Sequence, residues 1–297
     1  MMDLLRTYQP LFDLFLLNVG FAFSQQVVLR AGVFSIGTAG FAALGSYAVA
    51  ILVQRYHFPA IPSVLIGLLF GMAAGWLLSL PLSRLRGIFQ AIATLAFVQI
   101  IVSLAFYAED LTGGAMGINS IPKLVTTWHL VVIIAVVMYF MYAIDRSGIG
   151  RAFDAIRQDE TVGAVLGVSI SKYHALAFII SGALGGFFGG LQSLYVYSIE
   201  PEQFGFAFMV NVLTFIVLGG RGTIIGPVIG TAFLTALPEL ARPLAENRPL
   251  VNGALLMLII AYMPHGLYDN TLIWLRNRRA AQRDRQMQGA ANAVSSS

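Results

Sequence analysis

Residues 174–197 read HALAFIISGALGGFFGGLQSLYVY and contain no Asp, Glu, Lys or Arg. A run of about 20 mainly apolar residues is long enough for a helix to cross the hydrocarbon core of a bilayer. Gly182, Gly186 and Gly190 recur four residues apart within it, which places them on one helix face. Small residues on one face let neighbouring backbones approach closely in lipid. The stretch therefore predicts a membrane-spanning helix in a compact bundle.

The rest of the chain has the same character. Of its 297 residues, 58% are hydrophobic and 11% are charged, and the mean hydropathy is +0.78. Soluble domains carry about 25% charged residues, so this composition cannot coat a water-exposed surface. Backbone groups in lipid must be satisfied internally, which leaves helices or closed barrels. Because the apolar runs are long rather than short and alternating, we predict an all-α, polytopic transmembrane helical bundle.

Hydropathy predicts about eight or nine spans. The first is the weakest, since Asp13, Asn18, Gln25 and Gln26 interrupt it. The stretches 31–53 and 219–230 are rich in glycine, so each is either a plain span or a broken, re-entrant element. The expected spans are about 10–29, 31–53, 58–80, 87–108, 128–144, 174–197, 205–219, 224–241 and 250–268.

Lys and Arg placement predicts the orientation. If loop 145–173 is cytoplasmic, thirteen basic residues fall inside and five outside, which is the bias of inner-membrane proteins. The N-terminus is then outside and the C-terminus cytoplasmic. We expect a transmembrane domain over 1–275 and a basic, disordered tail over 276–297. The basic residues of these loops account for the net charge of +4, so we expect no nucleic acid as a partner.

The chain lacks the motifs of the common membrane enzymes. It has two lysines, neither in a P-loop, and no cysteine. Its four histidines are scattered, without an H-E-x-x-H motif or carboxylates at metal-ligand spacing. We expect no catalytic residues, no metal, no cofactor and no enzyme activity.

The predicted spans also offer little charge for binding a solute. Asp13 and Glu239, near span ends, are their only charged residues, and Arg221 lies in the short link between two spans. Proton-coupled carriers usually need an ionisable group deep in the membrane, which weakens but leaves open a self-sufficient secondary transporter or channel. The neutral polar candidates for a translocation path are Thr94, Gln99, Asn211 and Thr214. Gly226 and Gly230 join Gly182, Gly186 and Gly190 as predicted helix-packing positions.

Loop 145–173 is the most charged interior stretch. Within it, 151–166 predicts one short amphipathic helix, with Gly167 ending it as the C′ residue. Acidic and basic residues alternate along it, whereas helices that lie on lipid are dominated by Lys and Arg. A docking helix for a partner is therefore favoured over an interfacial helix.

The loop and the span after it, GRAFDAIRQDETVGAVLGVSISKYHALAFIISGALGGFFGGL (150–191), resemble permease subunits of branched-chain amino-acid ABC importers. Four other stretches fit in the same order, and the LTGG element at 111–114 is most similar to the M-type subunit of the permease pair. They are AGVFSIGTAGFAALGSYAVA (31–50), LRGIFQAIATLAFVQI (85–100) with LTGGAMGI (111–118), VLGGRGTIIGPVIGTAFLTALPEL (217–240) and MPHGL (263–267).

The resemblance implies a heterodimer with a second homologous permease subunit, two cytosolic ATP-binding subunits that hydrolyse ATP, and an extracytoplasmic solute-binding protein. It implies that the loop helix is a cytoplasmic coupling helix that docks on the ATPase. The solute is implied to be a branched-chain amino acid, although relatives also carry urea, short amides and aromatic acids. The implied docking and coupling residues are Arg151, Arg157, Asp159, Glu160 and Gly167.

Overall fold

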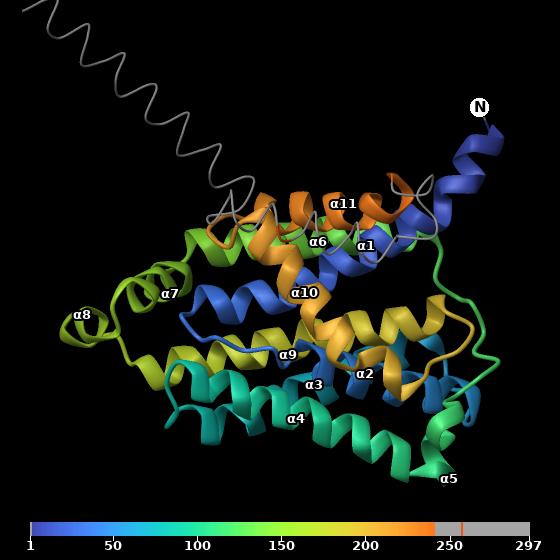
Figure 1. Cartoon of the computed structure of the whole chain (residues 1–297), viewed down its shortest axis with the longest axis horizontal. Coiled ribbons are helices and arrows are strands. Elements are labelled where there is room, and N and C mark those ends of the chain that lie inside the picture. Colours follow the sequence, from blue (N-terminus) through green and yellow to red (C-terminus); the bar gives the residue numbers. More distant parts are fainter. Residues whose placement is uncertain (1, 241–256, 258–297) are drawn as a thin grey trace, which may run out of the picture.

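The computed structural model describes residues 2–240 and residue 257, and the regular secondary structure within them consists of helices, joined by turns and loops, and one isolated antiparallel bridge between Ile118 and Ile199 (Figure 1). Most long helices run along one axis, with α7 and α8 at one end of the bundle and α5 at the other. We call these the α7 end and the α5 end. The helices are α1 (Met2–Arg30), α2 (Thr38–Gln54), α3 (Ala60–Leu82), α4 (Ile88–Tyr107), α5 (Glu109–Thr112), η1 (Gly114–Met116), α6 (Thr127–Arg146), α7 (Gly148–Gln158), α8 (Glu160–Val165), α9 (Ile170–Tyr195), η2 (Pro201–Phe204), α10 (Phe206–Gly219) and α11 (Ile225–Leu240).

Six stretches of the described chain are long and apolar enough to cross a membrane, fewer than the eight or nine expected. α2 and α11 coincide with two other expected spans, but both are shorter apolar helices. The ninth expected span (250–268), the domain boundary at 275 and the tail (276–297) lie outside the described residues, apart from residue 257 within that span. The six are Tyr8–Arg30, Ala60–Leu82, Ile88–Tyr107, Thr127–Arg146, Ile170–Tyr195 and Pro201–Gly219.

The core is built around α9, which packs against α1, α2 and α3. Glycines make these contacts close. A Cβ added at Gly186 would lie 2.9 Å from the Cα of Gly71, and one at Gly182 would lie 3.2 Å from the Cα of Gly75. A Cβ at Gly190 would meet the Val49 side chain at 2.7 Å. Backbones of α9 and α3 therefore touch directly, in the manner of small-residue interfaces in membranes.

Gly226 and Gly230 make a second close contact, between α11 and the end of α10. A Cβ at Gly226 would lie 3.0 Å from the carbonyl carbon of Gly220, and one at Gly230 would lie 2.7 Å from the Gly219 nitrogen. Gly220 itself has φ +107°, a value that L side chains rarely adopt. The chain can therefore break after α10 and fold α11 back against it.

The stretch 31–53 becomes helical only at Thr38, after a non-helical segment that follows the end of α1. α1 ends in a Schellman motif, in which Gly32 has φ +84° and the N–H of Val33 bonds to the Val28 carbonyl at 3.2 Å. Residues 33–36 are not helical, and α2 begins only at Thr38, which is buried. Helix α2 therefore starts inside the bundle rather than at its edge.

The loop predicted to form one helix over 151–166 forms two, so that prediction is wrong. α7 ends at Gln158, and α8 begins at Glu160. Between them Asp159 adopts an extended conformation, with φ −161° and ψ +119°. The side chain of an N-cap aspartate competes for the backbone N–H groups that a continuous helix would need. The Asp-Glu pair is the local signal of this break.

Candidate functional site

The helix pair α7–α8 projects from one end of the bundle (Figure 1). The Ser147 hydroxyl begins α7 by accepting a hydrogen bond from the Ile149 N–H at 3.1 Å. Phe153 on the inner face of α7 is buried and meets the Tyr173 ring edge-to-face at 6.2 Å between centroids. The apolar face of α7 is therefore seated on the bundle.

Caps at both ends define α8. The Asp159 carboxylate accepts hydrogen bonds from the N–H groups of Thr161 at 2.7 Å and Val162 at 3.4 Å. These bonds stabilise its ionised form and hold the pKa of Asp159 below the ordinary aspartate value. At the other end Gly167 has φ +81° and donates to the Ala164 carbonyl at 3.0 Å. Gly167 is thus the C′ residue, as the sequence predicted.

The α8 surface combines apolar and charged groups. Val162, Val165 and Leu166 are 54%, 84% and 71% exposed. The bundle therefore does not cover these three aliphatic side chains. Glu160 on the same helix lies 3.7 Å from the Arg86 guanidinium, which is itself exposed. α8 therefore presents aliphatic side chains beside charge.

The remaining docking candidates lie on α7. Arg151 is exposed and donates to the Arg146 carbonyl at 3.4 Å. Arg157 is partly buried and lies 3.6 Å from the Asp154 carboxylate one turn earlier. The structure thus brings Arg151, Arg157, Asp159, Glu160 and Gly167 to one end of the molecule, on two short helices.

Sequence reasoning missed one buried group at this end. Arg30 falls between the predicted spans 10–29 and 31–53, but its side chain is only 8% exposed and lies between two carboxylates. It contacts Asp145 at the end of α6 and donates to both oxygens of Asp154 on α7, at 3.3 and 3.1 Å. The pairs are 115 and 124 residues apart along the chain. No local pattern could have joined them.

The four candidate path residues divide by exposure. Thr94 and Thr214 are buried, whereas Gln99 and Asn211 are exposed. The Thr94 hydroxyl accepts from the Ile36 N–H at 3.1 Å and donates to the Ala91 carbonyl at 3.0 Å. The Thr214 hydroxyl donates to a backbone carbonyl of its own helix. Asn211 and Thr214 lie three residues apart on α10, but only Asn211 reaches the surface.

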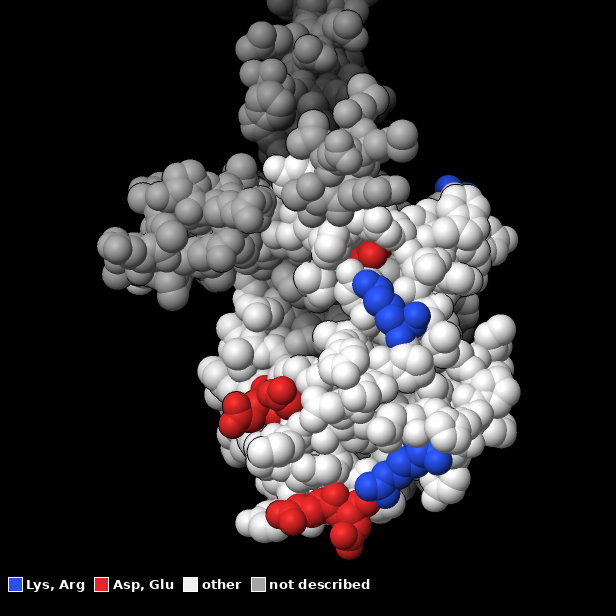
Figure 2. Space-filling view, turned by 90° about the vertical axis from the view of Figure 1, so that its right-hand side faces the viewer, with Lys and Arg blue, Asp and Glu red and all other residues white. Residues whose placement is uncertain are grey.

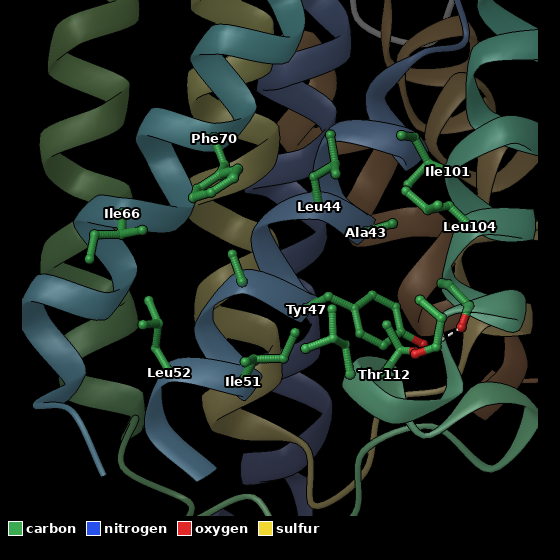
Figure 3. A pocket seen from close by; sticks show the side chains of 14 residues that line it. Ala43, Leu44, Tyr47, Ile51, Leu52, Ile66, Phe70, Ile101, Leu104 and Thr112 are labelled. Carbon is green, nitrogen blue, oxygen red and sulfur yellow. Dashed lines mark hydrogen bonds between the residues drawn. The ribbon is translucent and has the colours of Figure 1, made fainter. Parts of the chain in front are cut away.

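A cavity of about 460 Å³ lies between α2, α3, α4 and α5 (Figure 3). Its walls are almost wholly aliphatic and aromatic. The hydroxyl of Thr112 donates to the Ala105 carbonyl at 2.6 Å, and the buried Tyr47 hydroxyl has no partner among the described residues. No charged side chain lines the cavity. Burying an unpaired ion costs several kcal/mol, so this cavity does not suit a zwitterion.

The α5 end carries scattered charges of both signs on an otherwise uncharged surface (Figure 2). In residues 2–240 and 257, no group of three His, Cys, Asp or Glu side chains could hold a metal ion. The exposed charged residues at this end include Arg55, Glu109, Asp110, Lys123, Glu200 and Glu202.

The family model described as "Branched-chain amino acid transport system / permease component" matches residues 14–263. The chain belongs to this family. It is 31% identical to the high-affinity branched-chain amino acid transport system permease protein LivM of Escherichia coli (strain K12), over 88% of this chain and 69% of the relative. It is 32% identical to LivM of Salmonella typhimurium, over 82% of this chain and 66% of the relative.

The matched region thus spans about two thirds of the length of these LivM relatives. A more distant relative is the fructose import permease protein FrcC of Rhizobium meliloti, 25% identical over 79% of this chain and 71% of the relative. No solved structure matches the chain. Membership of a permease family, together with six apolar helices, makes this chain a multi-pass membrane transport protein.

Proposed function

We propose that this chain is a permease subunit of an ATP-driven importer in the bacterial inner membrane, with α7–α8 as its cytoplasmic coupling helices. Its partners are a second, homologous permease subunit, two cytosolic ATP-binding subunits and an extracytoplasmic solute-binding protein. The solute class is branched-chain amino acids, the class printed in the names of the LivM relatives. Urea, short amides and aromatic acids are related solutes that the assay below includes.

The observation that carries this proposal is the surface of α8. Three exposed aliphatic side chains at the end of a membrane bundle are unfavourable in water and suit a protein partner. Glu160 on α8 and Arg157 on the adjoining α7 supply, in this proposal, the charge that fixes the orientation of docking. The chain has no P-loop for hydrolysing ATP itself. In this proposal, an ATP-hydrolysing subunit that docks on this surface supplies the energy for transport.

The path for the solute lies, in this proposal, between this chain and the second permease. The side chains of Gln99 and Asn211 are exposed on apolar helices, whereas the hydroxyls of Thr94 and Thr214 form hydrogen bonds with backbone groups. A conduit must hold its solute weakly enough to release it. We expect the isolated permease pair to bind solute no more tightly than about 1 mM, about 4 kcal/mol.

The test is uptake into proteoliposomes that contain this chain with its co-expressed partner subunits and binding protein. Charge reversal at both docking positions, Arg157→Glu with Glu160→Arg, should abolish ATP-dependent uptake and weaken co-purification of the ATPase. Each lost interface contact is worth about 1–3 kcal/mol. Arg55→Glu, an exposed reversal at the opposite end, is the matched control and should retain uptake.

Normal uptake by the double variant would contradict the docking role of α7–α8. Uptake by this chain alone, without ATP, would instead favour a self-sufficient secondary transporter or channel. Competition by unlabelled leucine, urea, a short amide and an aromatic acid in the same assay identifies the solute class.

A further inference from the structure

Arg30 is held at the meeting point of three helices. It is the last residue of α1, and it contacts Asp145 in the last turn of α6 and Asp154 in the middle of α7. Its bond to Asp154 is bidentate, through Nε and one terminal nitrogen. This fork geometry fixes the direction of approach as well as the distance. The position of α7 is therefore tied to the end of α1.

Burial makes this tie hard to break. The Arg30 side chain is 8% exposed, whereas Asp145 and Asp154 are 34% and 36% exposed. Separating Arg30 from Asp154 would leave the buried guanidinium with one counter-charge, Asp145, instead of two, which is unfavourable. The two carboxylates face water on one side and can accept other partners. We therefore expect the backbone at Arg30 to move together with α7, because the Arg30–Asp154 pair joins them.

The backbone after Arg30 also rests on α7. At Gly32 an added Cβ would lie 3.4 Å from the Arg157 Cα, so the turn after α1 sits directly against the docking helix. The chain then runs through 33–37 to α2. The Gln25 amide contacts the Ser35 carbonyl, and the Ile36 N–H donates to the Thr94 hydroxyl. One extended segment thus connects α7 to the start of α2 and to α4.

We propose that Arg30 is the positioning residue through which α7 moves segment 31–37 and the buried start of α2 during the transport cycle. This inference rests on the proposed function, because it assumes that a partner displaces α7. Arg30 is buried, and its side chain pairs with Asp145 and Asp154. It acts through Asp154 and through the segment that follows it, so its loss should separate ATP hydrolysis from transport while leaving both partners assembled.

The first measurement is solute taken up per ATP hydrolysed in the assembled importer. Arg30→Gln and Asp154→Asn should each lower this ratio by roughly tenfold, within the range for residues that carry coupling between sites. Arg30→Lys keeps the charge but loses the bidentate geometry, so its ratio should be intermediate. Arg55→Gln is the control. In Asp154→Asn the Arg30 side chain remains paired with Asp145. This variant therefore still tests the inference if Arg30→Gln fails to assemble.

The second measurement follows segment 31–37 itself. Phe34 is 46% exposed, and the chain has no native cysteine, so Phe34→Cys gives a single reactive thiol. Its rate of reaction with a soluble maleimide should change when ATP is added to the parent importer. The rate should not respond to ATP in the Asp154→Asn background. A merely structural defect would change the thiol's reactivity without removing its response to ATP.

The outcomes separate the inference from the proposed function. If the parent importer, with all its subunits, shows no ATP-dependent uptake, the proposed function fails and the role of Arg30 fails with it. If the parent transports and Asp154→Asn retains both the uptake ratio and the ATP response at Phe34→Cys, the proposed function stands and the role of Arg30 is wrong.

Discussion

Replacement of Gly186 by alanine tests one of the close backbone contacts between helices in the bundle. The added Cβ would lie 2.9 Å from the Gly71 Cα and would also overlap the Gly67 carbonyl oxygen. Carbon atoms in good contact lie about 3.5 Å apart, so α9 and α3 must separate by at least about 0.6 Å (3.5 − 2.9) to relieve the contact with the Gly71 Cα. Both contacts are with backbone, so no side-chain rotation can relieve them. Overpacking of this kind costs about 1–3 kcal/mol.

The assay is thermal unfolding of the purified chain in detergent. Taking 2–4 °C per kcal/mol, as for soluble domains of 150–250 residues, Gly186→Ala should melt roughly 2–12 °C below the parent. Gly190→Ala should lose less, because its added Cβ meets the end of the Val49 side chain, which can move. Gly148→Ala is the control, since the nearest atom to its Cβ is Arg151 Nη2 at 3.9 Å. A Gly186→Ala variant as stable as Gly148→Ala would refute the close packing of α9 on α3.

Two further predictions concern the ends of the bundle. Met116 at the α5 end is 81% exposed and Val165 on α8 is 84% exposed. Met116→Cys should react with impermeant thiol reagents added outside, whereas Val165→Cys should react only after the inner face of the membrane is opened. The reverse pattern would overturn the orientation. The cap bonds lower the pKa of Asp159 in the folded protein. The ionised cap therefore stabilises α8 fully at a pH above the ordinary aspartate pKa of about 3.9, and this stabilisation is lost as the pH falls through the lower pKa of the folded state. A spin label at Val165→Cys should become more mobile over that acidic range, and the same change in an Asp159→Asn background would show that the cap is not responsible.

Much of the fold could be predicted because it depends on local sequence. Apolar runs determine the helices of a membrane bundle, since each must satisfy its own backbone in lipid. Six of the expected spans accordingly match helices long enough to cross, with ends shifted by a few residues. Gly167 was predicted as a C′ residue because that role needs only a positive φ at the end of a short helix. The break at Asp159 was also locally encoded, but the amphipathic pattern across 151–166 obscured it.

The sequence by itself determined a helical membrane bundle with a charged helical loop at one end. Only the tertiary structure decided which polar residues act together. Thr94, chosen as a possible path residue, proves to hold the segment before α2, and Gln99 on the same helix faces outward. Arg30 meets Asp145 and Asp154 across more than a hundred residues. The physical reason is that hydropathy is a property of each segment, whereas a buried charge finds its partners only when distant helices converge.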